Sequence, residues 1–176
     1  YKDISFGPKN MTLSDAEIDA RVHAAAEYVG LKKELLEKSP FDLSGGEKRR
    51  VAIAGVIAMQ PKVLILDEPT AGLDPIGRDR ILEMIKNYRE KTGSTILLVS
   101  HSMEDVAKIA TKVAVMNNAR LEMYGTVDEV YSQGERLREI GLNIPQISKV
   151  FEILKKNGHD FGSVYTVDRA VEVLSR

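Results

Sequence analysis

Two glycines directly before a helical pattern form the first group of residues that could bind a ligand. Ser44, Gly45 and Gly46 precede Glu47, where a stretch with helical spacing of apolar residues begins. Glycines let bare backbone amides approach an anion, and the N-terminus of a helix adds the positive end of its dipole. These residues could hold a phosphate, although Ser-Gly-Gly is also a common start for a helix that is capped by its serine.

Two carboxylates follow the apolar run at 63–66. Asp67 and Glu68 stand where that run ends, and Pro69 and Thr70 come next. A carboxylate at the end of a buried strand is placed to reach a magnesium ion, often through bound water. A solvated strand end beside a helix cap would carry the same two acids, so the pair alone leaves both interpretations open.

A second aspartate and a histidine complete the set. Asp74 precedes a helical pattern, and His101 follows the apolar run at 95–99. A lone histidine is most often a packed or surface residue. The three segments 43–47, 64–74 and 99–101 follow one another in this order, and each lies at the end of a predicted helix or strand. Together they indicate a shared site more strongly than any one of them does.

The elements that must position these residues alternate between strand and helix. Continuous apolar runs at 63–66 and 95–99 predict two strands that are buried on both faces of a parallel sheet. The helical pattern at about 76–91, which ends near Gly93, completes a βαβ unit between them. The fold class is therefore α/β.

Other local signals predict the remaining elements. Capping-box pairs begin two further helices, Ser14 with Glu17 and Thr126 with Glu129. The remaining segments are expected to be a short charged helix at 32–38, a helix at 102–110, a strand at 112–116 with a return strand at 120–124 across a turn at Asn117–Asn118, and two tail helices after Pro145 and around 167–174.

Composition limits the possible functions. The chain has 176 residues, of which 43% are apolar and 29% charged, as is ordinary for one globular domain. The net charge of -1 argues against non-specific binding of nucleic acid, and the absence of cysteine excludes disulfides and thiolate metal sites. No apolar run approaches the roughly 20 residues that span a bilayer. Any membrane role is expected to be peripheral.

With these motifs in this order, the chain resembles the ABC-transporter ATPase family along essentially its whole length. Residues 43–47 resemble the signature loop, 63–68 the Walker B strand and 71–74 the D-loop. The resemblance implies the C-terminal part of a P-loop NTPase domain that uses ATP and Mg²⁺. It divides the chain into a remnant of the helical subdomain (1–44), the C-terminal part of the ATPase core (45–133) and a helical tail (134–176).

The resemblance also implies a role for each site residue. The signature residues Ser44, Gly45, Gly46 and Glu47 would hold the γ-phosphate of ATP that a second ATPase subunit binds. Asp67 would bind magnesium, usually through water, and Glu68 would orient or deprotonate the attacking water. His101 would contact the γ-phosphate, and Asp74 would couple the two sites of a dimer.

Several stretches are similar to the ATPases of energy-coupling factor importers, which carry vitamins or cobalt and nickel ions. These are residues 4–10, 48–55, 70–75 and the tail 141–176. The similarity implies a subunit at the cytoplasmic face of the membrane, paired with itself or with a related ATPase and bound to a transmembrane coupling protein and a substrate-capturing component. Two residues depart from the common pattern: Glu47 where glutamine is usual, and Ala119 where glycine is.

No stretch of the sequence matches a glycine-rich Walker A loop with its lysine. That loop provides most of the phosphate cradle in this family. We therefore expect the chain to be a fragment that is inactive alone, with unpaired strand edges that make it unstable or self-associating. Arg49 and Arg50, in the first turns of the signature helix, are expected to be solvated.

Two alternatives remain at this point. A non-transport ABC ATPase could use the same motor on nucleic acid, which the balanced charge argues against. A truncated, non-catalytic module could instead bind a partner through its helical part or its tail.

Overall fold

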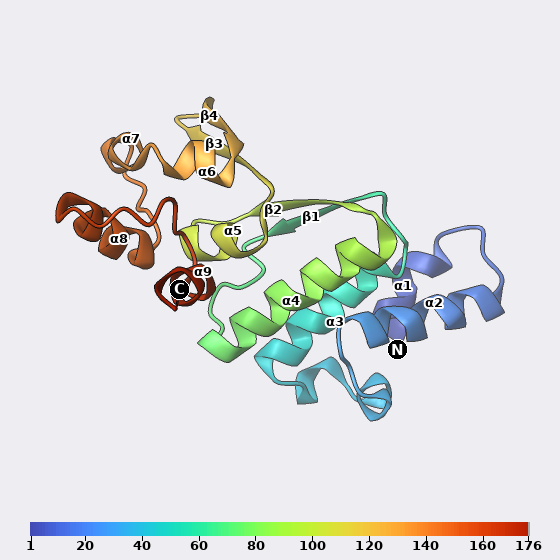
Figure 1. Ribbon diagram of the computed structural model, residues 1–176. Coiled ribbons are helices and arrows are strands. Elements are labelled where there is room, and N and C mark those ends of the chain that lie inside the picture. The colour runs from blue at the N-terminus through green and yellow to red at the C-terminus, as the bar shows by residue number, and fades with distance from the viewer. Residues whose placement is uncertain (176) are drawn as a thin grey trace. The chain divides into compact units, whose positions relative to one another are not determined.

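The computed structural model describes residues 1–175, and their contacts divide the chain into two compact units. The first unit is Tyr1–Val99, and the second begins at Ser100. The α/β class is confirmed, since both helices and strands form as the sequence indicates (Figure 1).

The first unit consists of helices around a single strand–helix–strand unit. Its elements, in chain order, are α1 (Lys2–Lys9), α2 (Asp15–Tyr28), the 3-10 helices η1 (Lys33–Glu37) and η2 (Pro40–Asp42), α3 (Gly45–Ile57), β1 (Val63–Asp67), α4 (Pro75–Thr92) and β2 (Thr95–Val99).

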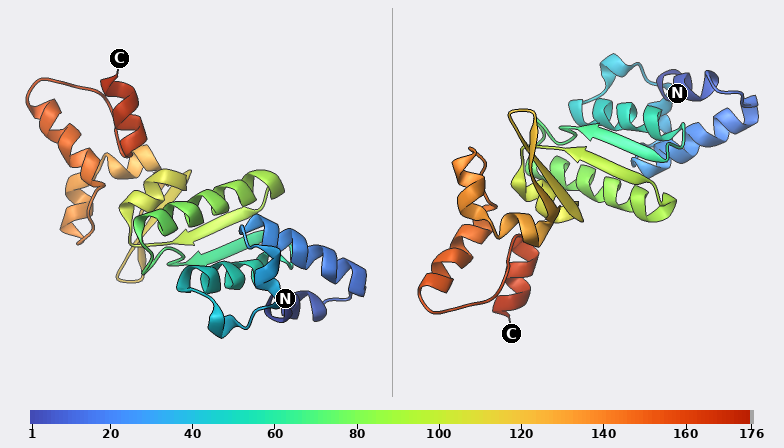
Figure 2. Two further views of the ribbon diagram at one scale, coloured as in Figure 1. Left: turned by 90° about the horizontal axis from the view of Figure 1, so that it is seen from below. Right: turned by 90° about the horizontal axis from the view of Figure 1, so that it is seen from above.

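The predicted βαβ unit is confirmed. Strands β1 and β2 pair in parallel, with a register that runs from Val63 opposite Thr95 to Asp67 opposite Val99. Figure 2 shows the two strands side by side and pointing the same way. Helix α4 connects them and ends at Gly93, whose φ of 68° is the left-handed conformation that glycine adopts without strain.

The prediction that both strands are buried on both faces is wrong for the described chain. Leu64 and Leu66 are 3% and 8% exposed, whereas Val63 and Ile65 between them are 56% and 63% exposed. Strand β2 alternates in the same way. Helices α3 and α4 lie on one side of the strand pair (Figure 1), and no other described element of the first unit covers its other face. The continuous apolar run therefore produces one core face and one bare apolar face.

Residues 2–9 form a helix that the sequence analysis did not predict. Helix α1 contains Pro8 and buries Ile4. It contacts both α2 and α3. At Gly7 a Cβ atom would lie 2.7 Å from Sδ of Met59, so a larger residue in α1 would require the flexible Met59 side chain to shift.

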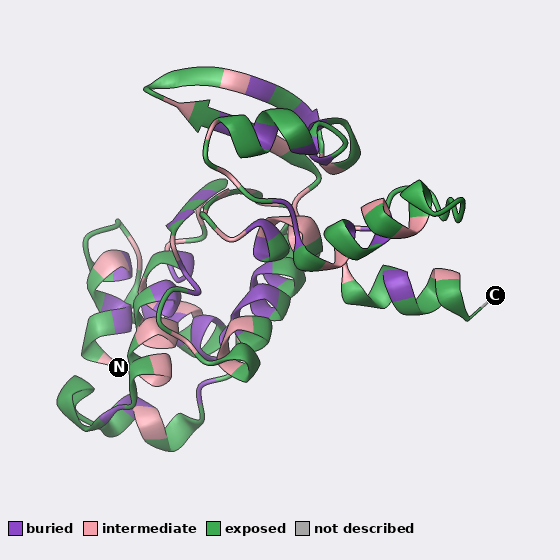
Figure 3. Ribbon diagram, turned by 90° about the vertical axis from the view of Figure 1, so that its left-hand side faces the viewer, coloured by how far each residue is buried: buried purple, intermediate pink, exposed green. Residues whose placement is uncertain are grey.

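The second unit contains a β-hairpin and short helices. Its elements are α5 (Met103–Ile109), β3 (Lys112–Asn117), β4 (Arg120–Thr126), α6 (Val127–Tyr131), α7 (Gly134–Glu139), α8 (Gln146–Lys156) and α9 (Val167–Leu174). The two predicted tail helices are confirmed as α8 and α9. Figure 3 shows few buried positions along the two tail helices, where Phe151 and Ala170 are the buried apolar residues of α8 and α9.

Two apolar clusters hold this unit together. The larger joins α5, the hairpin, α6 and α7 through residues that include Val115, Met123 and Leu137. The hydroxyl of Tyr131 donates to the Met103 carbonyl at 3.0 Å inside this cluster. The smaller cluster packs Phe151 of α8 against Val164 and α9.

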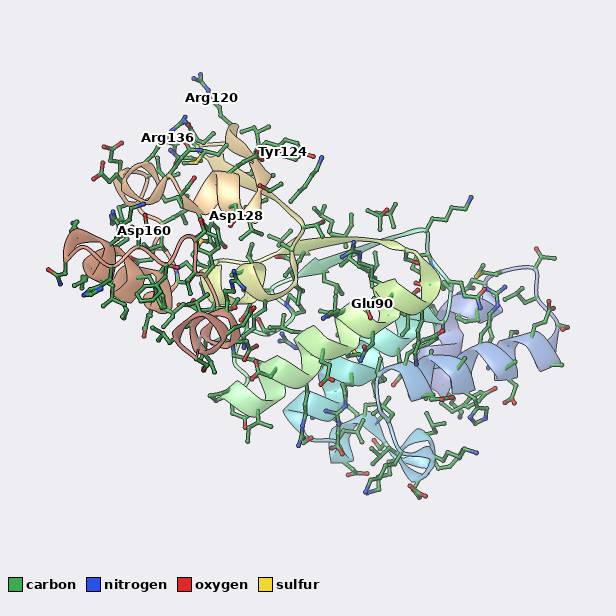
Figure 4. All side chains as sticks on the ribbon, in the orientation of Figure 1. Glu90, Arg120, Tyr124, Asp128, Arg136 and Asp160 are labelled. Carbon is green, nitrogen blue, oxygen red and sulfur yellow. The ribbon has the colours of Figure 1, made fainter. Side chains whose placement is uncertain are left out.

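The β3–β4 hairpin turns one residue later than predicted, at Asn118 and Ala119. Both have positive φ, 48° and 59°, which is the pattern of a type I′ turn between antiparallel strands. The return strand continues to Thr126 rather than Tyr124. Arg120 and Tyr124 project from this hairpin (Figure 4). Ala119 thus occupies a conformation that favours glycine.

Candidate functional site

Ser44 begins α3 with the predicted cap. Its Oγ accepts a hydrogen bond from the backbone N–H of Glu47 at 3.3 Å. In return, the Glu47 carboxylate accepts from the N–H of Ser44 at 2.8 Å and from its hydroxyl at 2.7 Å. Both polar donors of Ser44 are therefore engaged by Glu47 in this conformation.

These bonds also perturb the Glu47 carboxyl. The hydroxyl and the backbone N–H of Ser44 stabilise the ionised form and lower the pKa of Glu47 below its usual value. A phosphate approaching this loop would compete with Glu47 for the same two donors.

Gly45 and Gly46 are not required by the packing of the chain. A Cβ at Gly45 would meet nothing within 4 Å, and one at Gly46 would meet only Arg50 Nη1 at an ordinary 3.8 Å. Neither residue has a positive φ. The packing of the described chain therefore gives no structural reason for glycine at these two positions.

Asp67 and Glu68 lie where β1 ends. Asp67 is exposed and pairs in register with Val99 on the neighbouring strand. Glu68 has a φ of 45°, the left-handed conformation that is uncommon for a residue other than glycine. Its N–H donates to the Val99 carbonyl at 2.9 Å. Such conformations concentrate at functional sites, where the surrounding structure holds them.

Arg49 contacts this same residue, which the sequence analysis missed. Its Nη1 donates to the backbone carbonyl of Glu68 at 2.8 Å, and the side chain is half-buried. Arg50 is also half-buried, and its Nε is enclosed without a hydrogen-bond partner among the described residues. The expectation that both arginines are solvated is therefore wrong. The one signal available was their position on the helix that follows the glycines, which by itself indicates only a solvated turn.

Asp74 acts as the cap of α4. Its Oδ1 accepts from the backbone N–H of Gly77 at 3.0 Å, with Pro75 in the first helical position. This cap accounts for an aspartate at position 74 on structural grounds. Any further role in coupling two subunits stays a prediction.

His101 belongs to the second unit. It is exposed and precedes Ser102, which caps α5. The structure thus brings Arg49 to Glu68 within the first unit and holds Asp67 beside them on β1. His101 lies in the other unit of the chain.

The donor set suits one of the ways in which proteins hold magnesium. Among residues 1–175 there is no group of three or more His, Cys, Asp or Glu side chains that could hold a metal ion by itself. Magnesium is usually bound through one or two carboxylates together with substrate phosphates and water. The single exposed carboxylate of Asp67 fits that mode. In the described part of the chain, no helix is long and apolar enough to cross a membrane.

The fold and motifs match ABC transporter cassettes. A family model described as ABC transporter matches residues 4–71. The structure of cbiO1 from Clostridium perfringens, described as part of the ABC transporter complex cbiONQ, is 41% identical with a TM-score of 0.71, over 86% of this chain and 60% of that one. The dimeric structure of MJ0796, a bacterial ABC transporter cassette, is 26% identical with a TM-score of 0.58, over 67% of this chain and 50% of that one. The chain therefore has the ABC-type P-loop NTPase fold and is similar in sequence to ABC transporter ATP-binding domains.

Curated relatives narrow the match further. The energy-coupling factor transporter ATP-binding protein EcfA2 of Caldanaerobacter subterraneus subsp. tengcongensis is 52% identical over 177 residues, which cover 100% of this chain and 62% of that protein. EcfA2 of Clostridium perfringens is 53% identical over 175 residues, covering 98% of this chain and 61% of that protein. This chain is thus similar along its whole length to EcfA2 proteins, and it spans about three fifths of their length.

Proposed function

We propose that the chain is part of the ATP-hydrolysing motor of an energy-coupling factor importer for a metal ion, such as cobalt or nickel, or for a vitamin. The observation that carries this proposal is the pair Gly45 and Gly46. Nothing within the described chain requires glycine there. A phosphate at the N-terminus of α3 would require it, because the bare amides must approach the anion closely.

In this proposal the glycine loop and the carboxylates contact two different ATP molecules. Ser44, Gly45, Gly46 and Glu47 contact the γ-phosphate of ATP bound by a second ATPase subunit. Phosphate binding breaks the hydrogen bonds between Ser44 and the Glu47 carboxylate. The phosphate then takes the place of that carboxylate as the acceptor for Ser44. The similarity to a dimeric cassette supports this arrangement.

The carboxylates serve the nucleotide bound on their own side of the dimer. Asp67 holds Mg²⁺ through water, and the magnesium neutralises charge on the phosphates. Glu68 orients or deprotonates the attacking water. His101 contacts the γ-phosphate, and Asp74 couples the two sites.

The partners follow from the same proposal. A second ATPase subunit, identical or related, completes both sites. A transmembrane coupling protein and a substrate-capturing component complete the importer, with this subunit peripheral at the cytoplasmic face of the cell membrane. The relationship to cbiO1, a part of the complex cbiONQ, supports such an assembly.

ATP hydrolysis by a chimera tests the proposal. The chain would be joined to the part of the Caldanaerobacter EcfA2 protein that it does not match, and its activity would be compared with that of the 176 residues alone. We expect the chimera to hydrolyse ATP and the chain alone not to, because the sequence contains no Walker A loop. Removing a catalytic base typically lowers the rate by about 10²–10⁴-fold, so Glu68→Gln should do so in the chimera.

The matched control is Glu90→Gln. Glu90 is exposed on α4 (Figure 4), so this change removes the same charge away from the site. Equal rates for Glu68→Gln and the parent chimera would refute the role assigned to Glu68.

A further inference from the structure

We propose that Arg49 is a positioning residue for Glu68, and that it makes the phosphate-contacting end of α3 and the carboxylate of Glu68 move together. The inference rests on the proposed function for the role of Glu68. Its structural half, that Arg49 fixes the backbone of Glu68, stands on contacts within the first unit.

The first step is the contact itself. The guanidinium of Arg49 donates to the Glu68 carbonyl at 2.8 Å from a half-buried position, across 19 residues of sequence. A charged donor makes a stronger hydrogen bond than a neutral one, and partial burial reduces its competition with water. This contact is therefore more than a passing surface interaction.

The second step is the conformation that the contact holds. Glu68 has a φ of 45° and precedes Pro69, which restricts its backbone further. Both of its backbone polar groups are engaged, since its N–H donates to Val99 of β2 and its C=O accepts from Arg49 of α3 at 2.8 Å and from the N–H of Ala71 at 3.2 Å. With the peptide groups on both sides fixed, the Cα–Cβ bond has a fixed direction, and this direction sets the region that the carboxylate can reach.

The third step is the connection along α3. Arg49 lies five residues after Ser44 on the same helix, and the N–H of Lys48 donates to the Ser44 carbonyl at 2.9 Å, so the intervening turn is closed. A shift of the N-terminal end of α3 on phosphate binding would therefore carry Arg49 and the carbonyl of Glu68 with it. In the proposed dimer the phosphate at Ser44 belongs to one site and Glu68 serves the other. Arg49 would then connect the two sites within one subunit.

The first experiment measures the backbone and needs no nucleotide. Amide hydrogen exchange at Glu68 would be followed by NMR in the 176-residue chain and in its Arg49→Gln, Arg49→Lys and Lys48→Gln variants. Lys48 is the exposed neighbour on the same helix, so it matches the loss of charge. The amide of Thr95, bonded to the Lys62 carbonyl at the other end of the strand pair, is the reference.

We expect Arg49→Gln to raise the exchange rate at Glu68 relative to Thr95, Arg49→Lys to reverse part of this rise, and Lys48→Gln to leave it unchanged. Unchanged exchange at Glu68 in Arg49→Gln, or a rise shared equally with Thr95, would overturn the positioning role.

The second experiment measures hydrolysis by the chimera. A misplaced catalytic group can lower the rate by about 10²-fold, so Arg49→Gln should reduce kcat by roughly 10- to 100-fold with little change in KM. Arg49→Lys should recover part of the loss. In a Glu68→Gln background the Arg49 change should have no further effect, because the group that it positions is already absent.

The two experiments separate the two proposals. A rise in exchange at Glu68 with no hydrolysis by the parent chimera would refute the proposed function and leave the structural half standing. A loss of kcat that is equally large in the Glu68→Gln background would refute the connection between Arg49 and Glu68.

Discussion

Two departures from ordinary local preferences fall among the residues assigned to the site. Glycines occupy two helical positions where alanine would be more stable, and a glutamate occupies a left-handed conformation. Neither departure improves packing within the chain. Both have a simple explanation if a nucleotide approaches from outside.

Gly45→Ala should separate stability from function. Alanine is more stable than glycine by about 0.5–1 kcal/mol in the middle of a helix, which is an upper limit for Gly45 at the start of α3, and a Cβ at Gly45 meets nothing within 4 Å. We therefore expect urea unfolding of the chain to show a gain of at most that size, while ATP hydrolysis by the chimera falls. A loss of stability would show instead that position 45 needs glycine for folding.

The three capping boxes predict that the stability of the fold decreases at low pH. The pKa values of Glu17, Glu47 and Glu129 are lowered in the folded chain by hydrogen bonds from Ser14, Ser44 and Thr126 respectively. A lowered folded-state pKa gives stability that is present above the unfolded pKa and is lost as the pH falls through the folded one. Thermal melting from neutral pH down to pH ~3 should show this loss, because the ordinary pKa of glutamate is about 4.3.

Changing all three glutamates to glutamine should flatten this part of the profile, because glutamine cannot titrate. Glu90→Gln, on an exposed face of α4, is the control and should leave the profile unchanged. An acid loss of the same size in the triple variant would mean that other carboxyl groups are responsible.

At the scale of elements, much of the fold could be predicted from local sequence. Capping residues and apolar spacing predicted α2, α3 and α4, because each of these helices begins at a side chain that accepts from one of its own first amides. Apolar spacing after Pro145 and around 167–174 predicted the two tail helices. Helix α1 could not be predicted, since it contains Gly7 and Pro8 and is held by packing against α2 and α3. The Arg49–Glu68 contact joins residues far apart in sequence, and no local pattern encodes it.

The two faces of β1 predict a contrast between adjacent residues. Leu64 is buried against the helices, so Leu64→Ala should cost about 2–4 kcal/mol in the free energy of unfolding, as is usual for such cavities. Ile65 is 63% exposed, so Ile65→Ala should change it by about 0.5 kcal/mol or less. Chemical denaturation of the 176-residue chain measures both. Equal costs would mean that the second face is covered in solution.

The hairpin turn predicts a stabilising substitution. Ala119 has a φ of 59°, and the left-handed conformation costs a residue with a Cβ roughly 1–2 kcal/mol. Ala119→Gly should therefore raise the thermal midpoint, whereas Asn118→Gly should do so less because asparagine tolerates this conformation. A fall in the midpoint with Ala119→Gly would argue against the type I′ turn.

At the scale of the whole molecule, the bare face of the β1–β2 pair is the main liability. Val63, Ile65, Leu97 and Val99 are all between 47% and 63% exposed, and the sheet has only two strands. Exposed apolar strands with unpaired edges promote association. The sequence indicated the apolar strands but not which face would be bare, because a continuous apolar run carries no alternation to mark one.

We expect the 176-residue chain to self-associate as its concentration rises, and Ile65→Lys with Leu97→Lys to reduce this. Both side chains are more than half exposed, so the lysines should not disturb the core. Sedimentation velocity over a range of concentrations measures the effect. A chain that remains monomeric at high concentration would contradict the expectation.

The left-handed backbone of Glu68 also has a consequence for evolution. A glycine or asparagine at position 68 would relieve the conformational cost while removing the carboxylate to which we assign the attacking water, so under this proposal selection for activity and selection for stability oppose each other there. A lineage that dispensed with hydrolysis would be free to accept the more stable residue. Some natural relatives could have glycine at the position equivalent to 68 beside an intact Ser-Gly-Gly loop. Such a subunit would still bind its partner's nucleotide but would not hydrolyse its own.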